Sequence, residues 1–460
     1  MSKPIHFSIS VEKQMANRNF GMETEINKAF MELNVRTILS HSKITKQRGV
    51  PTISLFFLII LLPFIKKGLV ALWSEAQLKN KIQAEKDTWY RFLNQERFNW
   101  RKAVTLLALK VIAACDPVAL KNKLLIADDT LCIKTGVKIE LVSYHFDHTT
   151  HRHVLGHQCL QLGYSNGVNF FPVDMAFHTS SRRPNLKTRA IDRRTHGWRR
   201  RQESLRKKTE VLIEMLQRAW NAGIDAGFIV FDSWFAHDGT IHGILAIGYG
   251  VICRLKRNQV RYEYQGRAYT LKQLWMRFAK KKTIWIHKHQ VKGISLRVFL
   301  PKSGLVQVVF VSDGHKQWHA FLCTDLELGA SEILANYARR WAIEVYFKDV
   351  KQMLFLGQEQ SRTFDALVAC YSIVMARYLL LVYILHKANG HGPLGPLFRD
   401  ISNDLQFIRA AEYFWEQIKA IIIISSALVF PAFEDTAIIN LIDIIENIIA
   451  SNLRFTSAKL

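Results

Sequence analysis

Two apolar segments of the sequence end in aspartates. LLIA is followed by Asp128 and Asp129, and GFIVF is followed by Asp232. A carboxylate at the end of a buried strand costs free energy to desolvate unless it is paired or bound to a metal. A turn or a helix N-cap would account for any one of these aspartates alone. A shared site therefore needs a further acid elsewhere in the chain.

That acid lies in the segment YARRWAIEVYFKDVKQ, from Tyr337 to Gln352. At about 100° per residue, one face of a helix would carry an acid among cations and aromatics: Tyr337, Arg340, Trp341, Glu344, Lys348 and Lys351. The neighbouring stripe is apolar and suited to pack on a sheet: Ile343, Phe347, Val350 and Leu354. An exposed helix with a Glu344–Lys348 pair explains the charges but not the aromatics. We predict a docked helix that presents Glu344 to a site.

Two strand-end acids and one helix acid form the ligand set of two-metal phosphoryl transfer. Carboxylate oxygens suit Mg²⁺, and two ions about 3.5 to 4 Å apart would activate the attacking oxygen and stabilise the leaving oxygen. Nearby cations would bind the phosphate backbone, and aromatic side chains would stack on an unpaired base.

The composition favours a polyanionic partner. The 460-residue chain has 63 Lys and Arg against 38 Asp and Glu, a net charge of +25. Such an excess indicates nucleic acid more often than a membrane surface, although a merely basic soluble protein is the simpler alternative. Apolar residues make up 49%, enough for a packed core. The six dispersed cysteines, without a CxxC pair, are typical of reduced thiols in a cytoplasm.

Other features narrow the class of protein. There is no GxxxxGK[ST] sequence, so we expect no nucleotide cofactor. The apolar run Ile53–Ile65 is too short to span a bilayer, as is Ile418–Phe433, so we expect buried helices and no membrane association. Five histidines and Cys159 in YHFDHTTHRHVLGHQC match no usual zinc spacing and are expected on an exposed hairpin. The cationic block 182–208 is expected to contact phosphate.

The expected elements divide the chain into regions. Helices are expected near the N-terminus at Glu25–Leu39, Ile53–Trp73, Ala76–Asn94 and Trp100–Ala114. Strand-like alternation begins at Lys123, and a helix is expected at Ser204–Ala222. Further strand-like runs lie between Val251 and Cys323: VRYEYQGRAYT, TIWIHKH, ISLRVFL, VQVVFVSD and WHAFLCT. A largely helical tail closes the chain.

The helix segment resembles the Y-R-E-K pattern of DDE-class bacterial insertion-sequence transposases, in the branch that includes the hairpin-forming cut-and-paste enzymes. The four positions that match the pattern residue for residue are Tyr337, Arg340, Glu344 and Lys351. Arg340-Trp341 and Lys348 also resemble residues of that branch. Asp128-Asp129-Thr130 is similar to its first-acid motif, and Asp232, with CRLKRN downstream, to its second-acid region. The resemblance covers roughly residues 120–380.

The resemblance implies an α/β fold with an RNase H-like mixed-sheet catalytic core. The core would comprise residues 121–250 and 325–385, with a mostly β insertion at 251–324. A helical N-terminal DNA-binding domain would occupy residues 1–120, and a helical C-terminal region, a candidate for dimerisation, residues 386–460.

The resemblance also implies roles for individual residues. Asp128, Asp232 and Glu344 would be the catalytic metal ligands. Asp129 is the alternative to Asp128, which we prefer because it stands two residues before Thr130, as in related cores. The DNA-binding residues would be Tyr337, Arg340, Trp341, Lys348 and Lys351.

The function expected from this resemblance is DNA transposition. The chain would bind the inverted-repeat ends of its element, cleave them with two Mg²⁺ ions (Mn²⁺ as a substitute) and transfer the strands to target DNA. A hairpin intermediate is one route. We expect a homodimer on paired ends in the bacterial cytoplasm. The alternatives are an RNase H-fold nuclease and a domesticated, catalytically silent DNA-binding relative.

Overall fold

The computed structural model describes residues 24–68, 85–115, 123–147, 150–182, 190–280, 282–312, 317–390, 392–429 and 440–445. The chain divides into two compact units. The helical unit comprises residues 1–40, 45–93 and 380–460, and the sheet unit comprises residues 41–44 and 94–379. Each unit is described by itself.

The described part of the helical unit contains short helices and one long one: α2 (Glu25–Glu32), α3 (Val35–His41), α4 (Thr52–Leu61), α7 (Lys86–Leu93) and α16 (Gly395–Val429). The prediction of a single helix at Glu25–Leu39 is wrong. Asn34 adopts a left-handed conformation with φ of 50° and separates α2 from α3. Helix α4 ends before Pro63, which has no N–H to continue the helix. The first half of the helix predicted at Ala76–Asn94 lies outside the described residues, and the second half is present as α7.

The sheet unit is built on a mixed sheet that has 12 strands within the described residues. The strands of its first half are β1 (Leu124–Ile133), β2 (Ser143–Asp147), β3 (Arg152–Ser165), β4 (Phe170–His178), β5 (Phe228–Phe231) and β6 (Gly250–Leu255). Those of the second half are β7 (Arg261–Tyr264), β8 (Arg267–Thr270), β9 (Ile284–Ile286), β10 (Val291–Leu300), β11 (Gly304–Ser312) and β12 (Trp318–Cys323). The strand-like runs predicted between Val251 and Cys323 are confirmed.

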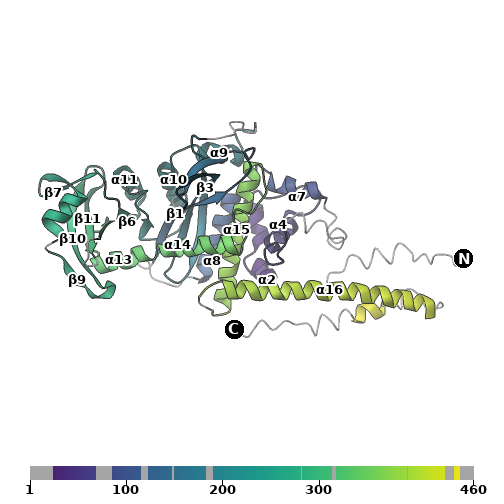
Figure 1. The fold of residues 1–460 in the computed structure, drawn as a ribbon. Coiled ribbons are helices and arrows are strands. Elements are labelled where there is room, and N and C mark those ends of the chain that lie inside the picture. Colours follow the sequence, from purple (N-terminus) through teal and green to yellow (C-terminus); the bar gives the residue numbers. More distant parts are fainter. Residues whose placement is uncertain are drawn as a thin grey trace. The chain divides into compact units, whose positions relative to one another are not determined.

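The strand order is β2-β3-β1-β5-β6-β12-β11-β10-β7-β8, with β4 also on β3 and β9 on β10. At its centre β1, β5 and β6 are parallel, and β3 and β12 run antiparallel beside them. Figure 1 shows how β6 and the strands after it extend the sheet away from β1. Leu124–Ala127 are fully buried, because helices cover both faces of a central parallel strand. The α/β prediction is confirmed at this level.

Six helices of the sheet unit position the residues that matter below: α8 (Trp100–Cys115), α9 (His196–Ser204), α10 (Lys208–Asn221), α11 (Asp238–Ile247), α13 (Ala330–Ala338) and α14 (Trp341–Gln352). The helix predicted at Trp100–Ala114 is confirmed as α8. The one predicted at Ser204–Ala222 begins later, at Lys208. Both α8 and α10 pack on β4, and α14 packs on β1.

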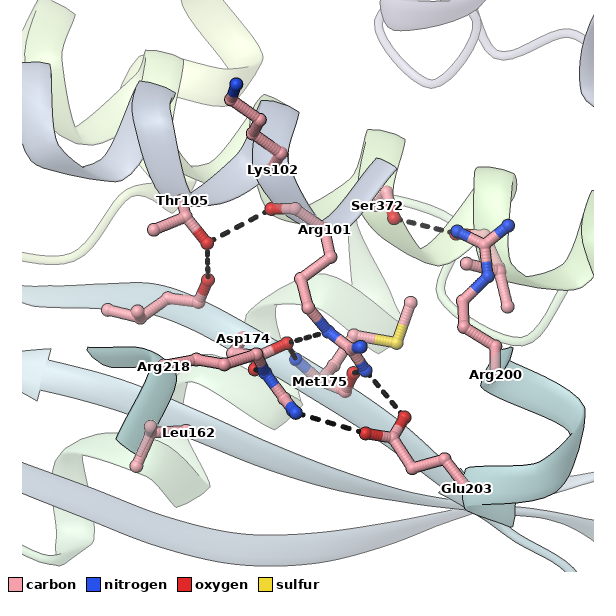
Figure 2. Close-up of polar contacts among 12 residues, drawn as sticks. Arg101, Lys102, Thr105, Leu162, Asp174, Met175, Arg200, Glu203, Arg218 and Ser372 are labelled. Carbon is pink, nitrogen blue, oxygen red and sulfur yellow. Dashed lines mark hydrogen bonds and ion pairs between the residues drawn. The ribbon is translucent and has the colours of Figure 1, made fainter. Parts of the chain in front are cut away.

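A buried ionic network joins β4 to three helices (Figure 2). The Arg101 guanidinium donates to Asp174 Oδ1 at 2.8 Å and to Glu203 Oε2 at 2.6 Å. Arg218 donates to Asp174 Oδ2 at 2.8 Å and lies 3.3 Å from Glu203 Oε1. Two cations and two acids therefore alternate around one ring, and the side chain of Asp174 is 3% exposed.

Three members of the cationic block are buried in ion pairs, which corrects the expectation that the whole block lies against phosphate. Arg201 donates to the carboxylates of Glu140 and Asp365. Arg200 lies beside Asp365, and Lys208 pairs with Asp129. Their charges are neutralised inside the fold. Residues 183–189 of the block lie outside the described residues.

Helix α15 (Phe364–Lys387) continues from the sheet unit into the helical unit. It is long and apolar enough to cross a membrane by length and composition. Its most apolar window is 94% buried inside the protein, as in the core helix of a globular fold.

Candidate active site

Strand β1 directs its two aspartates to opposite faces of the sheet. Side chains alternate along a strand, so Asp128 and Asp129 must point apart. Asp128 accepts a hydrogen bond from Arg340, which immediately precedes α14. Asp129 pairs with Lys208 on α10 and accepts from Gln158 Nε2 at 2.9 Å. Only Asp128 therefore lies on the face of β1 that α14 covers.

Asp232 is brought beside Asp128 by strand register. Strands β1 and β5 are parallel, with Ala127 opposite Phe231. The next residue on each strand is an acid, and neighbouring strands lie about 4.8 Å apart. Asp232 is half-buried where the chain leaves β5 and enters a turn. Asp232 follows the end of β5 as predicted, but Asp128 lies within β1, which continues to Ile133, so the prediction that Asp128 ends a strand is wrong. The register is consistent with a site shared by the two acids.

The segment from Tyr337 to Gln352 is not one helix, which corrects the prediction. Helix α13 ends at Ala338 and α14 begins at Trp341. Between them Arg340 N–H donates to Tyr337 O at 3.0 Å and Ala342 N–H to Arg339 O at 3.0 Å. These i→i−3 bonds tighten the turn and change the helical phase. Tyr337 therefore belongs to a different helix from Glu344.

The apolar stripe of α14 is confirmed. Ile343, Phe347, Val350 and Leu354 are all buried. Tyr346, which the stripe did not include, is also buried and packs on Phe170 with ring centroids 5.1 Å apart. The stripe holds α14 against the sheet and leaves Glu344 at its margin.

Arg340 connects two of the predicted acids. Its Nη1 lies 2.6 Å from Asp128 Oδ2, and its Nη2 donates to Glu344 Oε1. The side chains of Asp128 and Glu344 are 22% and 33% exposed, so solvent reaches both. The structure thus brings Asp128, Arg340 and Glu344 together, with Asp232 on the neighbouring strand.

The cluster holds more negative charge than Arg340 compensates. The pKa of Asp128 is raised to about 6: burial is the largest cause and the charges of Asp129 and Asp232 add to it, while Arg340 opposes the rise. A carboxylate with a raised pKa gains from an added cation. Oxygen donors of this kind fit a hard divalent ion such as Mg²⁺.

No preformed metal cage is present in the described part of the chain. Among those residues, no three His, Cys, Asp or Glu side chains are grouped closely enough to hold an ion. Asp128, Asp232 and Glu344 are the acids that would hold one, with Arg340 bonded to two of them.

The predicted DNA-contacting residues differ in exposure. Trp341 is 63% exposed and Lys348 is exposed, so both are available to a ligand. Tyr337 is half-buried, with its ring 4.7 Å from that of Phe321, which corrects the prediction that it lies on the open polar face. Lys351 Nζ donates to Leu131 O at 3.2 Å and so fastens α14 to β1.

Tyr337 is nevertheless next to the acids. Burial raises its pKa to about 12, and the charge of Asp232 adds to the rise, while Arg340 and Arg254 oppose it. The Arg340 guanidinium lies 6.0 Å from the centre of the Tyr337 ring.

Lys208 and Trp234 were not identified from the sequence. Lys208 pairs with Asp129, and its ammonium lies 3.9 Å from the centre of the Trp234 ring, which is 48% exposed. Trp234 follows Asp232 by two residues. That spacing was the available signal for Trp234, whereas nothing in the cationic block distinguished Lys208 from its neighbours.

Two parts of the chain match known protein families. A family described as "DDE superfamily endonuclease" matches residues 60–273, and one described as "Transposase DDE domain" matches residues 201–380. No curated protein matches the sequence. Among solved structures, the NurA nuclease from Sulfolobus solfataricus is similar over 48% of this chain and 72% of that chain, at 8% identity and a TM-score of 0.24. That likeness is too slight to carry an argument. The two family matches support a DDE-type transposase or endonuclease that acts on DNA.

Proposed function

We propose that this chain is a DDE transposase with an RNase H-like core. It binds the inverted-repeat ends of an insertion sequence, cleaves them and transfers the freed strands to target DNA, with a hairpin on the transposon end as one route. The observation that carries the proposal is the pairing of Asp128 and Glu344 through Arg340, with Asp232 next to Asp128 in register. These residues lie on three separate elements, and both family matches include Asp232.

The reaction needs an excess of acids at one place. Asp128, Asp232 and Glu344 would hold two Mg²⁺ ions, with Mn²⁺ as a substitute. Bound there, the ions would supply an activated water or 3′ hydroxyl and stabilise the leaving oxygen. Arg340 orients Asp128 and Glu344, and its guanidinium is placed to bind a non-bridging phosphate oxygen.

The geometry supports Asp128 rather than Asp129 as the first acid. Asp129 faces α10, where Lys208 already neutralises it and Gln158 donates to it. Its role is to hold α10 against β1. Asp128 faces Arg340 and Glu344.

Exposed residues around the acids would bind the DNA. Trp341 and Lys348 lie on the open side of α14, where a terminal phosphate or an unpaired base could reach them. The Tyr337 ring, whose centre lies 6.0 Å from the Arg340 guanidinium, would help to position it, and Lys351 holds the C-terminal turn of α14 to β1.

The other regions have proposed roles that follow from the same family. The basic N-terminal residues 1–120 would bind the transposon end, and residues 386–460 would pair two subunits in a homodimer. The protein would act in the bacterial cytoplasm. A nuclease without strand transfer is the second candidate, favoured by the endonuclease description of one matching family.

The test compares two adjacent aspartates. Full-length protein is incubated with Mg²⁺ and duplexes that carry the ends of its own element, below the melting temperature of every variant. Asp128→Asn should lower cleavage by about 10³-fold or more, which corresponds to about 4 kcal/mol of transition-state stabilisation. The matched control is Asp129→Asn. Its cleavage rate per folded molecule should equal that of the wild type. Wild-type-like cleavage in Asp128→Asn would refute the proposal. Joined products distinguish a transposase from a nuclease.

A further inference from the structure

The second half of the sheet carries an unusual excess of one charge. Between Tyr264 and Ser312 the sequence has ten Lys and Arg and no Asp or Glu. Every one of these cations that the structure describes is exposed. Like charges this dense repel one another, and a compact state has to overcome that repulsion. The segment therefore calls for acids from elsewhere in the fold, or from a ligand.

Some of these cations have partners within the protein. Arg297 pairs with Glu327 at 3.2 Å, and the Arg277 guanidinium lies 5.6 Å from the centre of the Tyr269 ring. Four lysines around strand β9 do not: Lys280, Lys282, Lys288 and Lys292. None of these four forms an ion pair with any acid in the part of the chain that the structure describes. We call this set, together with Trp285, the basic hairpin.

Strand register places an aromatic ring beside one of the lysines. In the antiparallel pair β9–β10, Trp285 is directly opposite Lys292. Residues paired in this way extend from the same face of the sheet, with Cβ atoms about 5 Å apart. The Trp285 side chain is 47% exposed. An exposed indole beside unpaired ammonium groups can pack on a sugar or base while the lysines bind the adjoining phosphates.

The basic hairpin is fastened to the helix that leads to the candidate active site. The short 3₁₀ turn His287–His289 connects β9 to β10, and His289 Nε2 forms a 2.8 Å hydrogen bond with Ser331 O at the start of α13. Helix α13 also packs on β10 (Figure 1). Its nine residues span about 13 Å and end where the turn to Arg340 begins. DNA that reaches the acids would therefore pass within a few base pairs of the hairpin.

We propose that the basic hairpin is a second DNA-contact surface, separate from the carboxylates, which binds the phosphate backbone without regard to sequence. The proposal rests on the proposed function, which identifies the polyanion as DNA. The binding of phosphates by lysines does not depend on that function. Binding of this kind is recognised by how strongly the affinity depends on salt concentration. Each phosphate contact releases counterions, so the logarithm of affinity falls with the logarithm of salt concentration by about 0.9 per contact.

The test measures that slope without catalysis. Binding of a fluorescein-labelled duplex to full-length protein is followed by anisotropy in EDTA over a KCl series. In the triple variant Lys282→Gln, Lys288→Gln, Lys292→Gln, the salt slope should become shallower by about 3. The matched control is Lys138→Gln, Lys272→Gln, Lys302→Gln, which removes three exposed charges outside the basic hairpin, from the loop after β1, from the short helix α12 (Leu271–Leu274) and from the turn after β10. The control should retain the wild-type slope.

Two outcomes would overturn the proposal. One is a slope in the hairpin variant equal to that of the wild type. The other is an equal change in both variants, which would assign the effect to net charge rather than to this surface. Melting temperatures of both variants should match the wild type, because all six side chains are exposed. If the hairpin variant keeps the wild-type salt slope and the wild-type protein cleaves DNA, only the hairpin surface is refuted. If the salt slope of the hairpin variant is shallower but the wild-type protein does not cleave DNA, only the proposed cleavage chemistry is refuted.

Discussion

Two clusters of arginine and carboxylate in the sheet unit are built in contrasting ways. In the ring formed by Arg101, Asp174, Arg218 and Glu203, each acid contacts two arginines, and the two carboxylates are 3% and 10% exposed. In the candidate active site, a single Arg340 lies between two acids that are 22% and 33% exposed, and Asp232 adds a third.

The two clusters differ in how far their arginines compensate the acids. Burial opposes ionisation of Asp174, but Arg101 and Arg218 outweigh it and hold the pKa of that carboxyl below its ordinary value. Burial also opposes ionisation of Asp128, and Arg340 does not outweigh it, so its pKa is raised to about 6. The ring is electrically neutral, and its two acids are buried. The other cluster carries uncompensated negative charge that a solvent cation can reach.

The largest expected effect on stability follows from breaking the closed ring. Asp174→Asn removes the charge that Arg101 and Arg218 share, leaving two partly buried guanidinium groups undercompensated. We expect the free energy of unfolding of the sheet unit to fall by about 3–5 kcal/mol, measured by urea denaturation. Asp192→Asn breaks the exposed pair with Arg194 and should have a much smaller effect, because solvent screens that pair. Equal losses of unfolding free energy in the two variants would mean that the ring contributes no more to stability than an exposed ion pair does.

Urea denaturation of Asp128→Asn should show a gain in the free energy of unfolding, where Asp174→Asn shows a loss. The size of this gain should depend on pH. The folded pKa of Asp128 is about 6, above the ordinary value of 3.8, so its ionised form destabilises the fold. This penalty is present above pH 6 and is relieved as the pH falls toward 4. In EDTA, Asp128→Asn should therefore be more stable than the wild type at pH 7.5, by up to about 3 kcal/mol.

The advantage of Asp128→Asn should shrink to near zero by pH 4. The deficit of Asp174→Asn should stay constant over that range, because the pKa of Asp174 is lowered and its contribution is lost only at lower pH. A difference between Asp128→Asn and wild type that does not change between pH 7.5 and 4 would contradict the assignment.

The smallest expected effect is stabilisation by metal. At a Mn²⁺ concentration tenfold above its dissociation constant, the wild type should gain about 1.4 kcal/mol, seen as a rise in melting temperature. Asp128→Asn and Asp232→Asn should lose this rise, and Asp174→Asn should keep it on its lower baseline. A rise of the same size in all variants would show that the ion binds elsewhere.

Much of the fold could be predicted from local pattern. Alternation identified the strands between Val251 and Cys323, and the spacing of Ile343, Phe347 and Val350 identified the buried stripe of α14. Apolar runs ending in Asp128 and Asp232 predicted the strands β1 and β5 beside these acids, although β1 continues past Asp128 to Ile133. These features depend on neighbours within a few residues along the chain, which is the range that a sequence pattern contains.

The pairings that define the clusters could not be predicted in this way. Arg340 and Asp128 are 212 positions apart, and Arg201 and Asp365 are 164 apart. Alternation along β1 requires Asp128 and Asp129 to face apart, but only the placement of α10 and α14 decides which of them meets Lys208 and which meets Arg340. The turn at Arg339 and Arg340 likewise separates Tyr337 from the face of Glu344 that a straight helix would give it.

The sequence by itself thus determined the residue types, their strands and helices, and the excess of positive charge. The tertiary structure decided which charges are neutralised inside the fold, as with Arg200, Arg201 and Lys208, and which stay exposed to solvent, as around β9. The physical reason is that a charge is neutralised by whatever lies a few ångströms away in space, and distance along the chain does not fix that neighbour.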